Sequence, residues 1–119
     1  MADLPPAFIC QVEQHAHDGD TWQCSNGTKV RLAGVDANEL DGSCHTTCAS
    51  MPAQQASAFV DRLIFRQRLS CQPVGRSYQR IVARCTLPDG RSLSCAVVAA
   101  GAAVRWDRYW RQYGMGECR

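Results

Sequence analysis

The sequence lacks any long hydrophobic run. Its longest apolar stretch covers residues 95–104, whereas a helix that spans a bilayer needs about 20 residues. The first residues, MADLPPAF, also lack the basic start and apolar stretch of a signal peptide. They look like a chain from which such a peptide was removed and to which Met1 was added. We therefore expect a periplasmic or secreted protein that does not contact a membrane.

Internal repeats, low-complexity tracts and linkers are absent as well. A chain of 119 residues has the length of one ordinary domain, which is enough to bury a single core. We therefore predict one domain over residues 1–119, in which residues 1–6 form a flexible N-terminus. We also expect a monomer.

C-x-x-C pairs do not occur, which argues against a ribbon-type zinc site and a thioredoxin-like redox motif. Eight cysteines are nonetheless present. Eight buried free thiols would be unusual, so four disulfides in an oxidising compartment are the better interpretation. About a hundred pairings are open to eight cysteines. A metal site that combines the three histidines with two cysteines is a minor alternative, because CHTTC lacks the usual zinc spacing; its members would be His15, His17, His45, Cys44 and Cys48.

Lysine is almost missing: Lys29 stands against twelve arginines. Arginine suits bidentate phosphate binding, although a GC-rich genome would explain the same bias at least as well. The charges are also unevenly divided. Residues 1–50 carry two basic and seven acidic side chains, and residues 51–119 carry eleven basic and four acidic ones. The first part therefore suits a cation and the second an anion.

Alternating and strand-forming residues predict strands over residues 7–14, 21–25 and 28–35. Asn26-Gly27 between the second and third runs is a strong hairpin signal. We therefore expect three consecutive antiparallel strands at the start of the fold.

The rest of the chain predicts helices mixed with strands. A helix is expected from Met51 to about Gln67, with Ser50 as its cap and Pro52 in its first turn. Two strands follow over residues 69–73 and 79–87. A helix over residues 93–100 ends at Gly101, and a last one covers residues 106–113. The sequence thus predicts an α+β fold, a small five-stranded barrel with three helices around it.

Carboxylates gather at one end of the predicted hairpin. Asp20 opens its first strand and Asp36 ends its second, so strand pairing brings them to the same rim. Glu39 follows in the loop over that rim, and Arg31 lies within the strand between them. Three converging carboxylates are suited to a hard divalent cation such as Ca²⁺ or Mg²⁺. Asp18 and Asp41 are interpreted as ordinary turn residues.

Three motifs in this order resemble those of the staphylococcal nuclease (thermonuclease) family. DGDTW, VRLAGVDANE and YQRIVARC are similar to its DGDT, RL-x-G-x-D-x-P-E and Y-G-R-x-x-A segments, and AVVAAGAA is similar to the helix and glycine that follow. The resemblance covers about residues 8–104. It implies a five-stranded OB-type barrel with three helices, a fold class that binds oligonucleotides.

The resemblance also implies roles for individual residues. Asp20, Asp36 and the carbonyl of Ala37 would hold one Ca²⁺. Arg31 and Arg80 would bind the scissile phosphate, and Glu39 would act as general base or orient the attacking water. Tyr78 would lie near the nucleotide. Two positions depart from the family pattern: its proline is Asn38 here, and its glycine is Gln79.

On this fold the cysteines fall on neighbouring elements. We expect the pairs Cys10–Cys24, Cys44–Cys48, Cys71–Cys85 and Cys95–Cys118. The alignment fades beyond Val104, and for the aromatic residues there we expect core packing in most cases, although stacking on a base is open; they are Trp106, Tyr109, Trp110 and Tyr113.

The leading hypothesis is therefore a Ca²⁺-dependent endonuclease or exonuclease of the thermonuclease type. It would hydrolyse DNA and RNA with low sequence specificity and leave 3′-phosphate ends. The second hypothesis is a weak or inactive module of the same fold that binds nucleic acid or protein. The third is a disulfide-stapled structural or inhibitory protein. The first hypothesis predicts cleavage that a chelator abolishes. The second predicts salt-sensitive binding without cleavage, and the third predicts neither cleavage nor binding.

Overall fold

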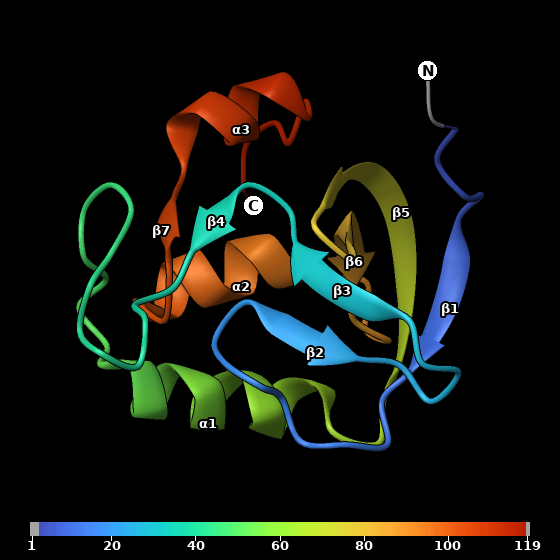
Figure 1. The fold of residues 1–119 in the computed structure, drawn as a ribbon, viewed down its shortest axis with the longest axis horizontal. Helices are drawn as coiled ribbons and strands as arrows, with labels where there is room; N and C mark the ends of the chain where they lie inside the picture. The colour runs from blue at the N-terminus through green and yellow to red at the C-terminus, as the bar shows by residue number, and fades with distance from the viewer. Residues whose placement is uncertain (1–2, 119) are drawn as a thin grey trace.

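A five-stranded curled sheet and three helices make up the fold (Figure 1). The computed structural model describes residues 3–118, so Met1 and the first part of the expected flexible N-terminus lie outside the described residues. The sheet order is β1-β5-β6-β3-β2, and a second, two-stranded sheet pairs β4 with β7. The strands are β1 (Phe8–Gln11), β2 (Thr21–Gln23), β3 (Lys29–Leu32), β4 (Val35–Asp36), β5 (Arg68–Ser77), β6 (Arg80–Thr86) and β7 (Val104–Arg105), and the helices are α1 (Ala53–Ile64), α2 (Leu93–Ala100) and α3 (Asp107–Gln112).

The predicted hairpin is present as β2 and β3. Thr21 pairs with Arg31 in its antiparallel register. The turn uses Asn26, whose side-chain oxygen accepts from the Thr28 N–H, and Gly27, which has φ +92°. Only glycine adopts that conformation without strain. The open end of the hairpin is thereby set, with the Asp20 carbonyl accepting from the Leu32 N–H.

The expectation of three consecutive antiparallel strands is wrong for the first strand. β1 pairs with β5 and stands at the opposite end of the sheet order from β2. Alternation identifies a strand but not its partner. The two ends are nevertheless linked by the Cys10–Cys24 disulfide and by the Ser25 N–H, which donates to the Gln11 carbonyl. These links curl the sheet into a half-barrel.

β5 is longer than the predicted 69–73 because Pro73 does not end it. The register against β6 shifts between Pro73 and Gly75, and the strand continues to Ser77. A bulge of this kind tolerates proline and bends the strand. β5 and β6 therefore extend far enough to bring Arg80 beside the hairpin.

The predicted strand over residues 28–35 is divided in two at Gly34. This residue has φ +78°, and an added Cβ would lie 3.1 Å from the Trp110 ring. The chain turns there and leaves the main sheet, so that Val35 and Asp36 pair with Arg105 and Val104 instead. Asp36 therefore comes from β4 rather than from the end of the hairpin strand.

The first helix starts two residues later than predicted. Ser50 does not cap it: its hydroxyl and the Met51 N–H both donate to the Gly101 carbonyl, and Pro52 occupies the N-cap position. The second helix agrees with the prediction, with Ser92 accepting from the Cys95 N–H and Gly101 ending the helix in the left-handed conformation. The last helix is α3, slightly shorter than expected.

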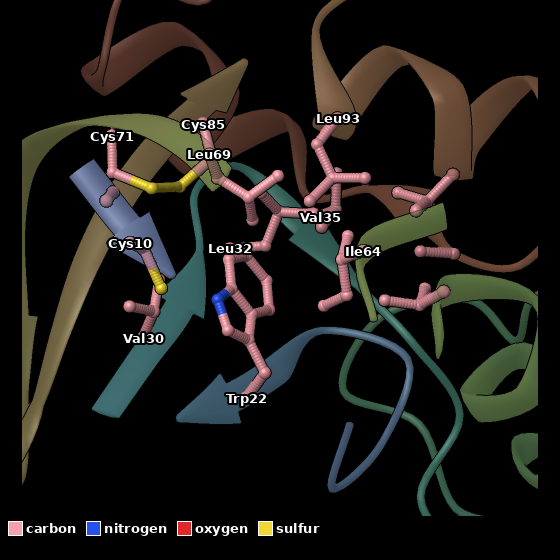
Figure 2. Close-up of a cluster of buried hydrophobic side chains, with 14 of the residues drawn as sticks. Cys10, Trp22, Val30, Leu32, Val35, Ile64, Leu69, Cys71, Cys85 and Leu93 are labelled. Atoms are coloured by element: carbon pink, nitrogen blue, oxygen red, sulfur yellow. A yellow bond between two sulfur atoms is a disulfide. The ribbon is translucent and has the colours of Figure 1, made fainter. Parts of the chain in front are cut away.

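The core lies between the curled sheet and the helices. Figure 2 shows Trp22, Leu32, Val35, Ile64, Leu69 and Leu93 pointing into it, and all six are at most 1% exposed. All eight cysteines are paired, in the pairing that the sequence analysis expects: Cys10–Cys24, Cys44–Cys48, Cys71–Cys85 and Cys95–Cys118. No helix within residues 3–118 has the length and hydrophobicity of a membrane span.

Candidate nuclease site

Arg31 lies between two buried carboxylates. Its Nη1 is 3.2 Å from Asp20 Oδ2, and its Nη2 is 3.7 Å from Asp36 Oδ1. The Arg31 side chain is 13% exposed, that of Asp20 8% and that of Asp36 1%. Two acids and one base are therefore largely buried together. We call these three residues the buried cluster.

Asp20 accepts two hydrogen bonds in addition to its contact with Arg31. Its Oδ2 accepts from the Ala37 N–H at 2.9 Å, and its Oδ1 accepts from the Thr21 hydroxyl at 3.1 Å. Burial raises the pKa of Asp20 to about 6, against the lowering effect of Arg31, and the nearby Asp18 adds to the rise. Arg31 thus does not offset the effect of burial on Asp20.

Asp36 faces a different partner on its other side. Its Oδ2 accepts from the His45 N–H at 3.0 Å, and its Oδ1 lies 3.0 Å from His45 Nδ1. Glu39 joins them: one donor atom from each of Asp36, Glu39 and His45 lies within 4.8 Å of the others. We call these three residues the exposed trio, because Glu39 and His45 are open to solvent.

The structure therefore brings the predicted carboxylates together in two sets rather than one. Asp20 and Asp36 meet through Arg31, and Glu39 meets Asp36 at the solvent side. The sequence analysis placed His45 only in the minor alternative with the cysteines. All eight cysteines are in disulfides, so that thiol site is wrong. The sequence signal for His45 was its position inside the short loop that the Cys44–Cys48 disulfide closes, a few residues after Asp36 and Glu39.

Asn38 stabilises the loop that carries Glu39 and His45. Its side-chain amide donates to the carbonyls of Ala49 and Met51, and its side-chain oxygen accepts from the Ala49 N–H at 2.8 Å. Proline could make none of these side-chain contacts. Asn38, which stands where the family pattern has proline, thus links the start of the loop to its end through its side chain.

Arg80 approaches the buried cluster from β6. Its Nη1 lies 3.4 Å from the hydroxyl oxygen of Thr21, the same hydroxyl that donates to Asp20. Ser77 accepts from the other guanidinium nitrogens through its carbonyl and hydroxyl oxygens. Arg31 therefore contacts Asp20 directly, and Arg80 contacts it through the Thr21 hydroxyl.

The family model described as staphylococcal nuclease homologue matches residues 29–116. The chain belongs to this family. The matched range includes Arg31, Asp36, Glu39 and Arg80 but begins after Asp20, so the place of Asp20 in the site rests on its geometry. None of the curated proteins compared with the chain matches it.

Two hollows flank the arginines of this staphylococcal nuclease homologue. One, of about 160 Å³, lies between Arg31 and the C-terminal aromatic residues, and its lining includes Arg31, Arg76, Trp106, Tyr109 and Tyr113. The other, of about 950 Å³, lies on the Arg80 side, and its lining includes His15, His17, Lys29, Tyr78 and Arg80. The site is thus open on both sides.

The expectation of core packing for most C-terminal aromatic residues is wrong. Trp110 is buried, and its indole N–H donates to the Gly116 carbonyl. Trp106, Tyr109 and Tyr113 are only partly buried and form a row of ring contacts 5.0 and 5.7 Å between centroids. Only Tyr109 and Trp110 lie within α3, and as consecutive residues of a helix with about 3.6 residues per turn they point in different directions.

Tyr78 and Gln79 lie in the turn between β5 and β6. The Tyr78 side chain is 96% exposed, its φ is +58°, and the Arg80 guanidinium carbon lies 6.0 Å from its ring centroid. Gln79 faces the larger hollow and leaves Arg80 in contact with Thr21.

Proposed function

We propose that the protein is a Ca²⁺-dependent phosphodiesterase that hydrolyses DNA and RNA with little sequence preference and leaves 3′-phosphate ends. The observation that carries the proposal is the buried cluster with Arg80 beside it. Two carboxylates and two arginines converge on one open site, and a phosphodiester with a cation would satisfy both kinds of charge.

The residues present fit a calcium ion. Burial raises the pKa of Asp20, and a cation beside this carboxyl group would favour its ionised form; carboxylate and carbonyl oxygens are the donors that Ca²⁺ prefers. Asp20, Asp36 and the Ala37 carbonyl would hold it. When bound, Ca²⁺ supplies positive charge that polarises a phosphoryl oxygen.

The arginines and Glu39 would carry out the protein's part of the reaction. Negative charge grows on the phosphoryl oxygens as water attacks, and two guanidinium groups held in place stabilise it. Arg31 lines the smaller hollow and Arg80 the larger, so both face positions that a nucleic-acid strand can occupy. The exposed Glu39 would accept the proton of the attacking water.

Four disulfides indicate an oxidising environment. We place the protein in the periplasm or outside the cell for that reason. The proposal requires no partner other than the nucleic acid, and we expect a monomer.

The test compares cleavage with binding in the same samples. The wild type should cut end-labelled single-stranded DNA and RNA to fragments that end in 3′-phosphate, whereas Arg80→Ala should still fold and lose most cleavage. Salt-sensitive binding without any cleavage by the wild type would instead indicate a binding module of this family.

A further inference from the structure

The exposed trio combines one nitrogen donor with two carboxylates. Calcium and magnesium prefer oxygen donors, whereas imidazole nitrogen suits Zn²⁺, Cu²⁺ and Ni²⁺. His45 therefore changes the kind of ion that this side of Asp36 attracts. Because the trio shares only Asp36 with the proposed calcium ligands, the two sites can be tested separately.

We propose that Asp36, Glu39 and His45 form a binding site for a first-row transition-metal dication, with Zn²⁺ as the representative ion. The ion would bind between His45 Nδ1 and Asp36 Oδ1, which lie 3.0 Å apart. Water molecules complete the coordination. This inference does not depend on nuclease activity.

The distances agree with shared coordination. Metal–ligand bonds of about 2.1 Å place neighbouring ligand atoms of one ion roughly 3 to 3.5 Å apart. His45 Nδ1 and Asp36 Oδ1 are 3.0 Å apart, and the Glu39 carboxylate oxygen lies within 4.8 Å of both. Glu39 is exposed, so a small side-chain rotation is enough to bring it to coordinating distance.

His45 is held in place before any ion arrives. Its backbone N–H donates to Asp36, its ring stacks on Trp106 at 5.0 Å and 23°, and the preceding residue is closed into the Cys44–Cys48 disulfide. An ordinary surface histidine loses side-chain freedom when it binds an ion. Here most of that freedom is already lost in the folded protein.

Asp36 Oδ1 has its closer contact with His45 and only a longer one with Arg31. Arg31 Nη2 stands 3.7 Å from it, against 3.0 Å for His45 Nδ1. Arg31 makes its shorter contact with Asp20, at 3.2 Å. An ion bound to the trio therefore need not displace the arginine.

The chain provides a matched control in a second histidine–aspartate pair. His15 Nδ1 lies 2.7 Å from Asp61 Oδ2, and the His15 ring stacks on Phe65 at 4.3 Å. In the described part of the chain, no second carboxylate joins this pair to make a three-donor group. His15 thus reproduces the close aspartate contact and the ring stacking of His45 without the third ligand.

The experiment titrates metal-free, oxidised, untagged protein with Zn²⁺ by calorimetry, with Ca²⁺ titrated in parallel. We expect one Zn²⁺ per chain. His45→Asn and Glu39→Gln should each weaken Zn²⁺ binding by at least about tenfold, and His15→Asn should leave it unchanged. His45→Asn should affect Ca²⁺ binding much less than Zn²⁺ binding. Equal Zn²⁺ affinity in His45→Asn and the wild type, or an equal loss in His15→Asn, would overturn the proposal.

A second measurement needs no variant and so cannot be confused with misfolding. Paramagnetic Ni²⁺, an ion that imidazole nitrogen suits, broadens the signals of nearby nuclei when it is added to ¹⁵N-labelled wild type. With Ca²⁺ present in excess, we expect the His45 imidazole signals to broaden at lower Ni²⁺ concentration than those of His15 and His17. Broadening of all three at the same concentration contradicts a site at His45.

Discussion

The two sides of Asp36 differ in almost every physical respect. On one side, Asp20 and Arg31 of the buried cluster are largely shielded from solvent, and burial raises the pKa of Asp20. On the other side Glu39 and His45 stand in solvent on a loop closed by a disulfide. The buried side therefore determines stability and charge balance, while the exposed side is free to exchange protons, water and ions.

Removing the arginine should have the largest effect. Arg31→Gln leaves two buried carboxylates without their cation, so metal-free protein at pH 7 should lose about 3–5 kcal/mol of unfolding free energy, and cleavage should be lost as well. Urea unfolding measures the first and DNA digestion the second. Arg91→Gln is the control, because its ion pair with Asp89 is more than half exposed, and its unfolding midpoint should stay the same. Equal midpoints for Arg31→Gln and Arg91→Gln would contradict a buried cluster.

On the exposed side, a substitution should change the rate without changing stability. Glu39→Gln should lower kcat/KM on single-stranded DNA by about 10²–10⁴-fold, the range for a general base, at an unchanged unfolding midpoint. Glu117→Gln, also exposed, should keep full activity. If Glu39→Gln unfolds the protein, the role of Glu39 is structural. The buried and the exposed side of Asp36 would then not differ in their effect on stability.

The stability of the metal-free protein should depend on pH through Asp20. Its pKa is about 6 in the folded protein against 3.8 ordinarily, so the folded state holds this proton more tightly than the unfolded state. Its contribution to stability is therefore present below about pH 4 and is lost as pH rises through about 6. At about 1.4 kcal/mol per tenfold change in proton affinity, the loss is at most roughly 3 kcal/mol.

Urea unfolding at pH 5 and pH 7 measures this effect as a difference between the wild type and Asp20→Asn, which cancels the other titrating groups. We expect the wild type to lose more stability than the variant between these two pH values. Excess Ca²⁺ should reduce the difference, because a bound cation favours the ionised carboxylate. A larger loss in the variant would mean that the pKa of Asp20 is not raised in the folded protein.

The smallest effect is expected in the loop that joins the two sides. Asn38→Ala removes three side-chain hydrogen bonds to Ala49 and Met51, and it should cost about 1–3 kcal/mol of stability. Hydrogen exchange should increase in residues 38–50 and stay the same in the β2–β3 hairpin. Asn26→Ala, which affects only the hairpin turn, is the matched control. Faster exchange in the hairpin of Asn38→Ala would contradict the separate roles of loop and cluster.

The local elements could be predicted because each depends on neighbours in sequence. The β2–β3 hairpin follows from Asn26-Gly27, and the end of α2 from Gly101. The meeting of Asp20 and Arg31 follows from hairpin pairing, whereas Asp36 reaches Arg31 from β4, after the chain has turned at Gly34. The partner of β1 could not be predicted, since alternation does not say which strand lies alongside.

Features that depend on contacts across the fold were missed. The division of the strand at Gly34 is explained by Trp110, 76 residues further on, which packs where a Cβ would point. Ser50 fails to cap α1 because it contacts Gly101 instead. His45 reaches Asp36 through a loop whose path depends on Asn38 and the Cys44–Cys48 disulfide. None of these contacts leaves a periodic pattern in the sequence.

The most direct test of the central claim is digestion of single-stranded DNA by the oxidised wild type, once with Ca²⁺ and once with excess chelator. The buried acids and the two arginines predict cleavage with Ca²⁺ and none with chelator. Intact DNA in both samples, from folded protein, would contradict a catalytic site at Asp20, Asp36, Arg31 and Arg80.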